Sequence, residues 1–219
     1  MKYIDRRHAG IVLAKLLKEY SRRTDAIILA LPRGGVPVAY EIAVALSLAL
    51  DVFIVRKLGV PGHEELAMGA IASGGVSVFN KEIVQALHID QASIDIIKQA
   101  ELEELIRRER LYRGNSPFPD LLGKTIILVD DGIATGSTMK AALRALQQQK
   151  PATIIIAVPV AALSMADEIA CLADVIVCPL RPVNFYAVGL WYDNFSQTTD
   201  EEVIELLEKS KQHQEKEGD

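Results

Sequence analysis

The sequence predicts an α/β protein built on a doubly wound, mainly parallel sheet. Apolar, β-branched runs of strand length alternate with segments of helical period. The runs lie at 26–31, 51–56, 125–130, 153–160 and 174–178. Such continuous runs are typical of parallel strands that are covered on both faces. No Pro/Gly/Ser-rich linker divides the chain, so we expect a single domain over residues 1–210, followed by a polar, frayed tail over 211–219.

Three segments between these runs have helical period: VPVAYEIAVALSLAL (36–50), STMKAALRALQQQ (137–149) and LSMADEIACLA (163–173). Residues 81–113 depart from the alternation because they are helical and strongly charged throughout. Glu103 and Glu104 lie four residues before Arg107 and Arg108, which favours pairing on a solvated helix face. We interpret this region as a helical insertion with a solvated face, and packing on one edge of the sheet is the alternative. A subunit contact there, and hence a homo-oligomer, remains an alternative.

Composition excludes several classes of partner. The net charge of −5 and the absence of a long basic run argue against a nucleic-acid partner. The N-terminus lacks an apolar targeting segment, and the longest apolar runs are much shorter than a membrane span. We therefore expect a cytoplasmic protein without a membrane partner.

The stretch ILVDDGIATGST (127–138) carries the strongest chemical signal. A buried strand over 125–129 is followed by two acids and a Gly-rich turn, and Ser137 or Thr138 begins the next helix. Ligands of open α/β sheets bind beyond the carboxyl ends of the strands, where these residues fall. The backbone amides and hydroxyls of residues 135–138 would form a cradle for a phosphate group. A Walker loop is excluded because no lysine follows Gly136.

The two acids indicate which part of a ligand lies beside that phosphate. A carboxylate about 4 Å from a phosphate would be repelled by about 4 kcal/mol at an effective dielectric constant near 20, so Asp130 and Asp131 should face something else. Vicinal sugar hydroxyls are suitable donors, and the combination predicts a sugar-phosphate site. The alternative is an Asp-rich turn before a capped helix, which leaves the Asp-Asp-Gly order unexplained.

Three stretches resemble type I phosphoribosyltransferases, and the whole chain is similar to the stand-alone predicted phosphoribosyltransferase group. VDDGIATGST (129–138) resembles the family's signature for 5-phosphoribosyl-1-pyrophosphate (PRPP). LPRGGVPVAYEIA (31–43) resembles its pyrophosphate loop, whose unusual backbone can include a cis peptide bond. VRKLGVPGHEELAMGAI (55–71) resembles its flexible-loop region. The resemblance assigns substrate binding to Arg33, Gly34, Gly35, Ala134, Thr135, Gly136, Ser137 and Thr138.

The resemblance implies displacement of pyrophosphate from C1 of the ribose by a nitrogen nucleophile. Asp130 and Asp131 would hold the ribose, while Arg56 and Lys57, at the end of a core strand, would act on the leaving group together with Arg33 and PRPP-bound Mg²⁺. Residues 58–69 would close over the site as a mobile loop. A hydrolase or pyrophosphokinase acting on the same sugar phosphate and a non-catalytic PRPP-binding regulator are the alternatives.

The acceptor is the small-molecule partner that the sequence leaves open. The resemblance places a hood at residues 178–196, where an aromatic side chain such as Trp191 would stack on a planar acceptor. The run AVGLWYDNF is similar to the hood of 6-oxopurine enzymes, which makes Asp193 a candidate metal neighbour. Those enzymes carry an acid at the position of Ala134, so the alanine argues against a 6-oxopurine acceptor.

Overall fold

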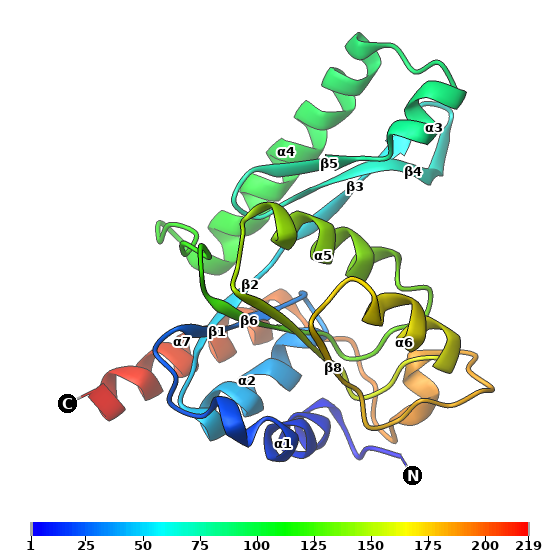
Figure 1. The fold of residues 1–219 in the computed structure, drawn as a ribbon. Helices are drawn as coiled ribbons and strands as arrows, with labels where there is room; N and C mark the ends of the chain where they lie inside the picture. Colours follow the sequence, from blue (N-terminus) through cyan, green and yellow to red (C-terminus); the bar gives the residue numbers. More distant parts are fainter. Residues whose placement is uncertain (1, 219) are drawn as a thin grey trace.

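The computed structural model describes residues 2–218 and places a parallel sheet of five strands at the centre of the molecule (Figure 1). The strand order is β2-β1-β6-β7-β8. Their bounds are Ala26–Ala30 (β1), Ala49–Val52 (β2), Thr125–Val129 (β6), Thr153–Ala157 (β7) and Val175–Val177 (β8). All four neighbouring pairs are parallel. The predicted α/β fold class is confirmed, and each strand begins within two residues of the start of an apolar run.

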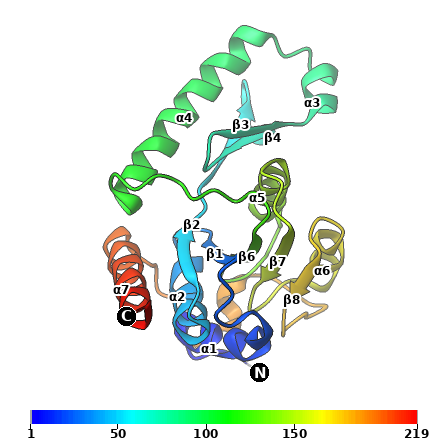
Figure 2. The same ribbon diagram turned by 60° about the vertical axis from the view of Figure 1, so that its left-hand side comes forward.

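Helices cover both faces of this sheet, as Figure 2 shows. Their bounds are Arg6–Leu16 (α1), Gly35–Leu46 (α2), Ser137–Gln148 (α5), Leu163–Ala170 (α6) and Asp200–Gly218 (α7). Successive strand residues alternate between two cores: Ile28 and Ile127 pack with α2 and α7, whereas Ile27 and Ile126 pack with α5 and α6. We expected a frayed tail over 211–219, but α7 is helical through Gly218. Among residues 2–218, none of the helices combines the length and apolarity that crossing a membrane requires.

A second sheet is the main departure from the predicted strand pattern. Strands β3 (Val55–Val60), β4 (His63–Ala72) and β5 (Val76–Phe79) form an antiparallel sheet of three strands, which we call the small sheet. The expected core strand over 51–56 is wrong, because β2 ends at Val52. The amide of Phe53 still bonds Ala30 O, but that of Ile54 bonds the Ser73 hydroxyl instead. An apolar run continues through this change of partner, so periodicity could not reveal it.

The segment expected as a mobile loop, residues 58–69, lies mostly in strands β3 and β4. Its glycines mark close approaches between strands: a Cβ on Gly59 would lie 2.7 Å from Glu64 O, and one on Gly69 would lie 2.4 Å from Val78 O. The β3–β4 register shifts on either side of Gly59, and residues 63–66 are exposed. The predicted loop is therefore a hairpin with an irregular end.

The predicted helical region 81–113 consists of α3 (Lys81–Ala86) and α4 (Gln91–Arg113), which pack on the small sheet above α5 (Figure 1). Arg113 fastens the end of α4 to the core. Its guanidinium donates to Asp51 Oδ1 at 2.7 Å and to Val52 O at 2.6 Å, and only 7% of the residue is exposed. The small sheet and these two helices thus form one unit that joins the parallel sheet beside β2.

Candidate active site

Two loops meet at the carboxyl edge of the parallel sheet because their strands are neighbours. Ala30 of β1 pairs with Val129 of β6, and the amide of Leu31 bonds Val129 O at 2.9 Å. The loop Arg33–Gly35 then turns back over the end of β6. A Cβ on Gly35 would lie 2.7 Å from Val129 O, so only glycine permits this contact. The peptide bond between Pro32 and Arg33 is cis, as the resemblance suggested.

Gly34 leaves space for the Asp131 carboxylate. A Cβ on Gly34 would lie 2.0 Å from Asp131 Oδ2, although the backbone of Gly34 has φ −60° and ψ −30°, which any residue can adopt. The requirement for glycine is therefore steric and comes from one side chain. The structure brings the Arg33–Gly35 loop and the acidic pair into one site, as the sequence predicted.

Arg6 is a member of this site that the sequence analysis missed. Its Nε donates to Asp131 Oδ2 at 2.8 Å, its Nη1 donates to Ser196 O at 2.6 Å, and its guanidinium lies 3.9 Å from the centre of the Phe195 ring. The adjacent Arg7 instead pairs with Glu41 at the surface. The pair Arg6-Arg7 alone gives no signal of which arginine points inward, so only the fold could identify it.

The acids of the site have unusual electrostatics. Burial raises the pKa of Asp130 well above its usual range, and the neighbouring Asp131 raises it further. Burial also raises the pKa of Asp131, although the Arg6 guanidinium opposes this shift. No salt bridge to Asp130 exists among residues 2–216, and its Oδ1 accepts only the Asp131 amide, at 2.8 Å. A hydroxyl donor or a cation would therefore suit Asp130.

The expected phosphate cradle is open to solvent at the start of α5. Ala134, Thr135, Ser137 and Thr138 are exposed, and the hydroxyls of Thr135 and Ser137 lie 3.4 Å apart. Gly136 is buried with φ +69°, and a Cβ there would lie 2.3 Å from Met165 Sδ. The helix begins at Ser137, so the first amides of α5 have no partner within the helix, and they follow the two acids by a short loop.

Arg33 lies in the loop beside the acidic pair and is partly exposed. Its Nη1 is 4.0 Å from Asp200 Oδ1, and its side chain is 38% exposed. Asp200, at the start of α7, also accepts a hydrogen bond from the Tyr112 hydroxyl. The ion pair is long and exposed, so it holds Arg33 only weakly and leaves the guanidinium free to turn toward an anion.

We expected Arg56 and Lys57 at the end of a core strand, but both lie within β3 of the small sheet. Because consecutive strand residues face opposite sides, the two side chains diverge. Arg56 pairs with Glu101 of α4 at 2.6 Å, whereas Lys57 faces a cavity beside Ser137 of α5. In this structure, therefore, the two cations do not act on one group together.

The hood residues are distributed between packing and exposure. Tyr192 is buried, and its hydroxyl donates to Asp131 O at 2.5 Å, while Trp191 is half-buried against the cluster formed by Tyr3 and Tyr192. Asp193 is exposed, and its amide bonds Tyr3 O at 2.8 Å. Within the described part of the chain, no three His, Cys, Asp or Glu side chains are grouped to hold a metal ion. Asp193 thus gains no co-ligands from the fold.

The N-terminal segment completes the site by pairing with the hood. The amide of Tyr3 bonds Trp191 O at 2.9 Å, and the amide of Asn194 bonds Ile4 O at 2.9 Å. These contacts place Arg6, at the start of α1, between the hood and the end of β6. The hood therefore positions an acidic residue of the site through a segment that lies more than a hundred residues away in the sequence.

A parallel sheet with an acidic pair, a glycine loop and an open helix N-terminus at its carboxyl edge defines a doubly wound α/β protein with a candidate site for a phosphorylated small molecule. Comparison with known proteins makes this class specific. The family profile described as "Phosphoribosyl transferase domain" matches residues 4–190. The chain belongs to the phosphoribosyl transferase family, which confirms the resemblance seen in its motifs.

Relatives match nearly all of this chain. Two proteins of Mycobacterium tuberculosis, from strains CDC 1551 / Oshkosh and ATCC 25618 / H37Rv, are provisionally named phosphoribosyl transferases and are 44% identical to it over 207 residues. The match covers 94% of this chain but 46% of each relative, so the chain spans about half their length. The crystal structure of TT1426 from Thermus thermophilus superposes with a TM-score of 0.84 at 38% identity, covering 94% of this chain and 98% of that one.

Proposed function

We propose that the chain catalyses the Mg²⁺-dependent transfer of the 5-phosphoribosyl group from PRPP to a nitrogen nucleophile, with release of pyrophosphate. The observation that carries the proposal is the contact between Gly34 and Asp131, which brings the expected pyrophosphate loop against the expected ribose acid. The open amides and hydroxyls of residues 135–138 follow the two acids in the chain, at the same edge of the sheet. Leaving group, sugar and phosphate then have neighbouring sites in the order in which they occur in PRPP.

The acidic pair would hold the ribose and respond to its charge. Asp131 is kept in place by Arg6, and Asp130 lacks a cationic partner, so ribose hydroxyls would supply the donors that Asp130 needs. As the C1–O bond to pyrophosphate breaks and the C1–N bond forms, positive charge develops on the ring. Two carboxylates beside the ring would offset that charge, while Arg33 would attract the departing pyrophosphate.

The residues of the site fit a magnesium ion that is held mainly by substrate. Mg²⁺ commonly takes one or two carboxylates together with substrate phosphates and waters. Asp130 is the carboxylate best suited to this, because burial and Asp131 both disfavour its unpaired charge. When bound, the ion would neutralise charge on the leaving group. Asp193, on the exposed hood, would have to act through water or substrate.

The acceptor site would lie between the hood and the acidic pair, with Trp191 as the candidate stacking surface. Ala134 is exposed in the loop between β6 and α5 and offers no base for the proton that the acceptor loses. A positioned base is worth about 10²- to 10⁴-fold in rate, so we expect hypoxanthine and guanine to be poor acceptors. A more acidic base or an amine should react better, since its proton can leave to water or pyrophosphate.

Binding and turnover test the proposal separately. Asp131→Asn should weaken binding of ribose 5-phosphate by about 1–3 kcal/mol in calorimetry, the range for a charged hydrogen-bond partner. Asp167→Asn, at an exposed position of α6, is the matched control. Equal affinity in the wild type and in Asp131→Asn would reject the ribose assignment.

Release of pyrophosphate from PRPP, measured against a panel of nucleobases and amines, distinguishes an enzyme from a PRPP-binding regulator. The pairing of Arg56 with Glu101 is the observation that favours the regulator, because it turns one expected catalytic cation away from the leaving group. Tight binding without turnover of any acceptor, in the presence of Mg²⁺, would support the regulator and contradict the transfer reaction.

A further inference from the structure

A cavity of about 190 Å³ lies between α5 and the small sheet, and neither Asp130 nor Asp131 lines it. Small residues of the small sheet and of α5, among them Ala67, Gly69 and Ala141, line part of its wall. Ser137, the first residue of α5, borders the cavity at one end. The cavity therefore joins two units of the fold close to the expected phosphate cradle.

Three cationic residues line this cavity. Lys57 of β3 is in register with Ala70 and Val78, which also line it, so this face of the small sheet looks toward α5. Lys140 and Arg144 lie four residues apart on α5 and thus on one face of the helix. Like charges around one cavity repel each other, and a bound anion would relieve that repulsion.

Little within the protein neutralises these charges. Lys140 pairs with Glu168 at 2.5 Å, but the Glu168 side chain is 57% exposed and the pair is correspondingly weak. Among residues 2–216, no salt bridge involves Lys57 or Arg144. Asn80 adds a neutral donor, because its Oδ1 already accepts from the amides that begin α3 and its side-chain NH₂ remains. The lining is thus rich in donors and contains no acid.

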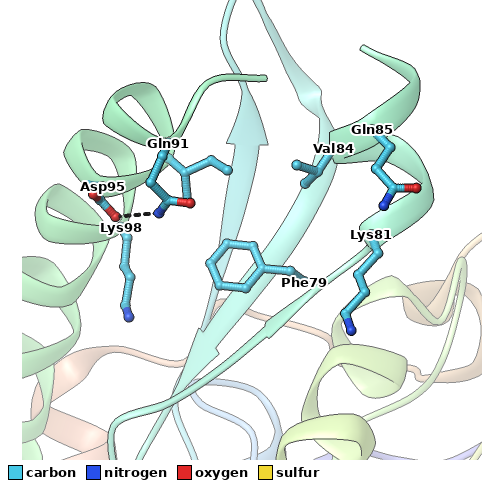
Figure 3. A pocket seen from close by; sticks show the side chains of 8 residues that line it. Phe79, Lys81, Val84, Gln85, Gln91, Asp95 and Lys98 are labelled. Atoms are coloured by element: carbon cyan, nitrogen blue, oxygen red, sulfur yellow. Dashed lines mark hydrogen bonds between the residues drawn. The ribbon is translucent and has the colours of Figure 1, made fainter. Parts of the chain in front are cut away.

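The wall of the cavity also contains Phe79, which borders a second cavity of about 250 Å³ (Figure 3). In that view the Phe79 ring projects between α3 and α4, with Val84 on one side and Gln91 on the other. Lys81 and Lys98 flank the same ring. An aromatic surface bordered by lysines lies directly beside the basic cavity, which suits a planar group attached to an anionic chain.

We propose that the cavity between α5 and the small sheet binds a ligand carrying a di- or triphosphate chain, with the phosphates on Lys57, Lys140 and Arg144. The chain would bridge the small sheet to α5 and so fix the unit that carries the β3–β4 hairpin relative to the phosphate cradle. This site adjoins the proposed PRPP site, because Ser137 borders both, but the inference does not depend on the transfer reaction. The ligand is either inorganic polyphosphate or a nucleoside polyphosphate whose base contacts Phe79.

Calorimetry with inorganic tripolyphosphate and with ATP, each without Mg²⁺ and at low salt, tests the proposal. Arg144→Gln should weaken binding of both probes about tenfold, as expected for loss of one charged hydrogen-bond donor. Arg110→Gln removes another exposed helical arginine, from α4, and should change neither affinity by more than about twofold. Lys140→Gln should act as Arg144→Gln does.

Arg33→Gln distinguishes this cavity from the pyrophosphate loop. Loss of tripolyphosphate binding in Arg33→Gln with full binding in Arg144→Gln would place the anion on the loop and overturn the proposal, as would the absence of binding of either probe to the wild type. Phe79→Ala separates the two sources of phosphate. Weaker binding of ATP alone would identify a nucleoside polyphosphate, and unchanged binding of both probes would identify the inorganic chain.

Discussion

Replacing Arg6 with glutamine removes the cation that holds Asp131 and keeps a side chain of similar length. The Arg6 and Asp131 side chains are only 11% and 15% exposed. Breaking a buried ion pair costs about 3–5 kcal/mol and an exposed pair about 0–1 kcal/mol, so we expect a loss of about 2–4 kcal/mol for this largely buried pair. For a domain of this size, at about 2–4 °C per kcal/mol, the melting temperature should fall by about 4–16 °C.

The substitution should also change how binding depends on pH. Arg6 opposes the effect of burial on the Asp131 carboxyl, so the pKa of Asp131 should rise further in Arg6→Gln. The carboxylate that accepts from ribose hydroxyls then forms only at higher pH. Affinity for ribose 5-phosphate should therefore fall most at low pH and recover as pH rises, which a purely structural defect would not produce.

Thermal unfolding and calorimetry from pH 5 to 9 measure both effects. Arg7→Gln is the matched control, because Arg7 is the adjacent residue and its side chain is 70% exposed in a pair with Glu41. Its melting temperature should change little, and its affinity should follow the wild-type pH profile. If Arg6→Gln and Arg7→Gln behave alike in both assays, the assignment of Arg6 as the residue that positions Asp131 is refuted.

Three further substitutions or measurements probe the same site. Asp130→Asn should raise the free energy of unfolding at pH 7. The pKa of Asp130 is raised in the folded state, so wild-type stability falls as pH rises above about pH 4, and the variant should show a flatter decline. Denaturant melts in which the free energy of unfolding depends on pH as in the wild type would contradict this. Gly34→Ala should displace the Asp131 carboxylate and weaken ribose 5-phosphate binding about tenfold or more. Its effect on binding should not add to that of Asp131→Asn, and additive effects in a double-mutant cycle would argue against the contact. The backbone amides of residues 60–66 should exchange hydrogen fast without ligand and more slowly once Mg-PRPP is bound. Slow exchange without ligand would exclude a closing hairpin.

Much of the site could be predicted because its signals are local. The buried run 125–129, the two acids and the start of a helix at Ser137 lie within fourteen residues, and each has its own pattern in the sequence. The loop at 33–35 was assigned through the resemblance of LPRGGVPVAYEIA to a known pyrophosphate loop. That these loops meet followed from the parallel strands, whose carboxyl ends lie at one edge of the sheet.

The small sheet was missed because its signals depend on partners. The run DVFIVR has the same apolar character on both sides of Phe53, yet its two halves pair with different sheets. The glycines that indicated a loop mark close contacts between strands instead. Neither the exchange of partner nor the close approach leaves a periodic trace, so the opposite directions of Arg56 and Lys57 could not be foreseen.

The sequence by itself determined the α/β class, the order of the core elements and the chemical identity of the acids and the cradle. Only the tertiary structure decided which cationic side chain pairs with those acids. Arg6 meets Asp131 across 125 positions of the chain because the N-terminal segment pairs with the hood. Local sequence fixes the backbone preferences and the face on which a side chain lies, but a buried charge takes its partner from whatever the folded chain brings within a few ångströms.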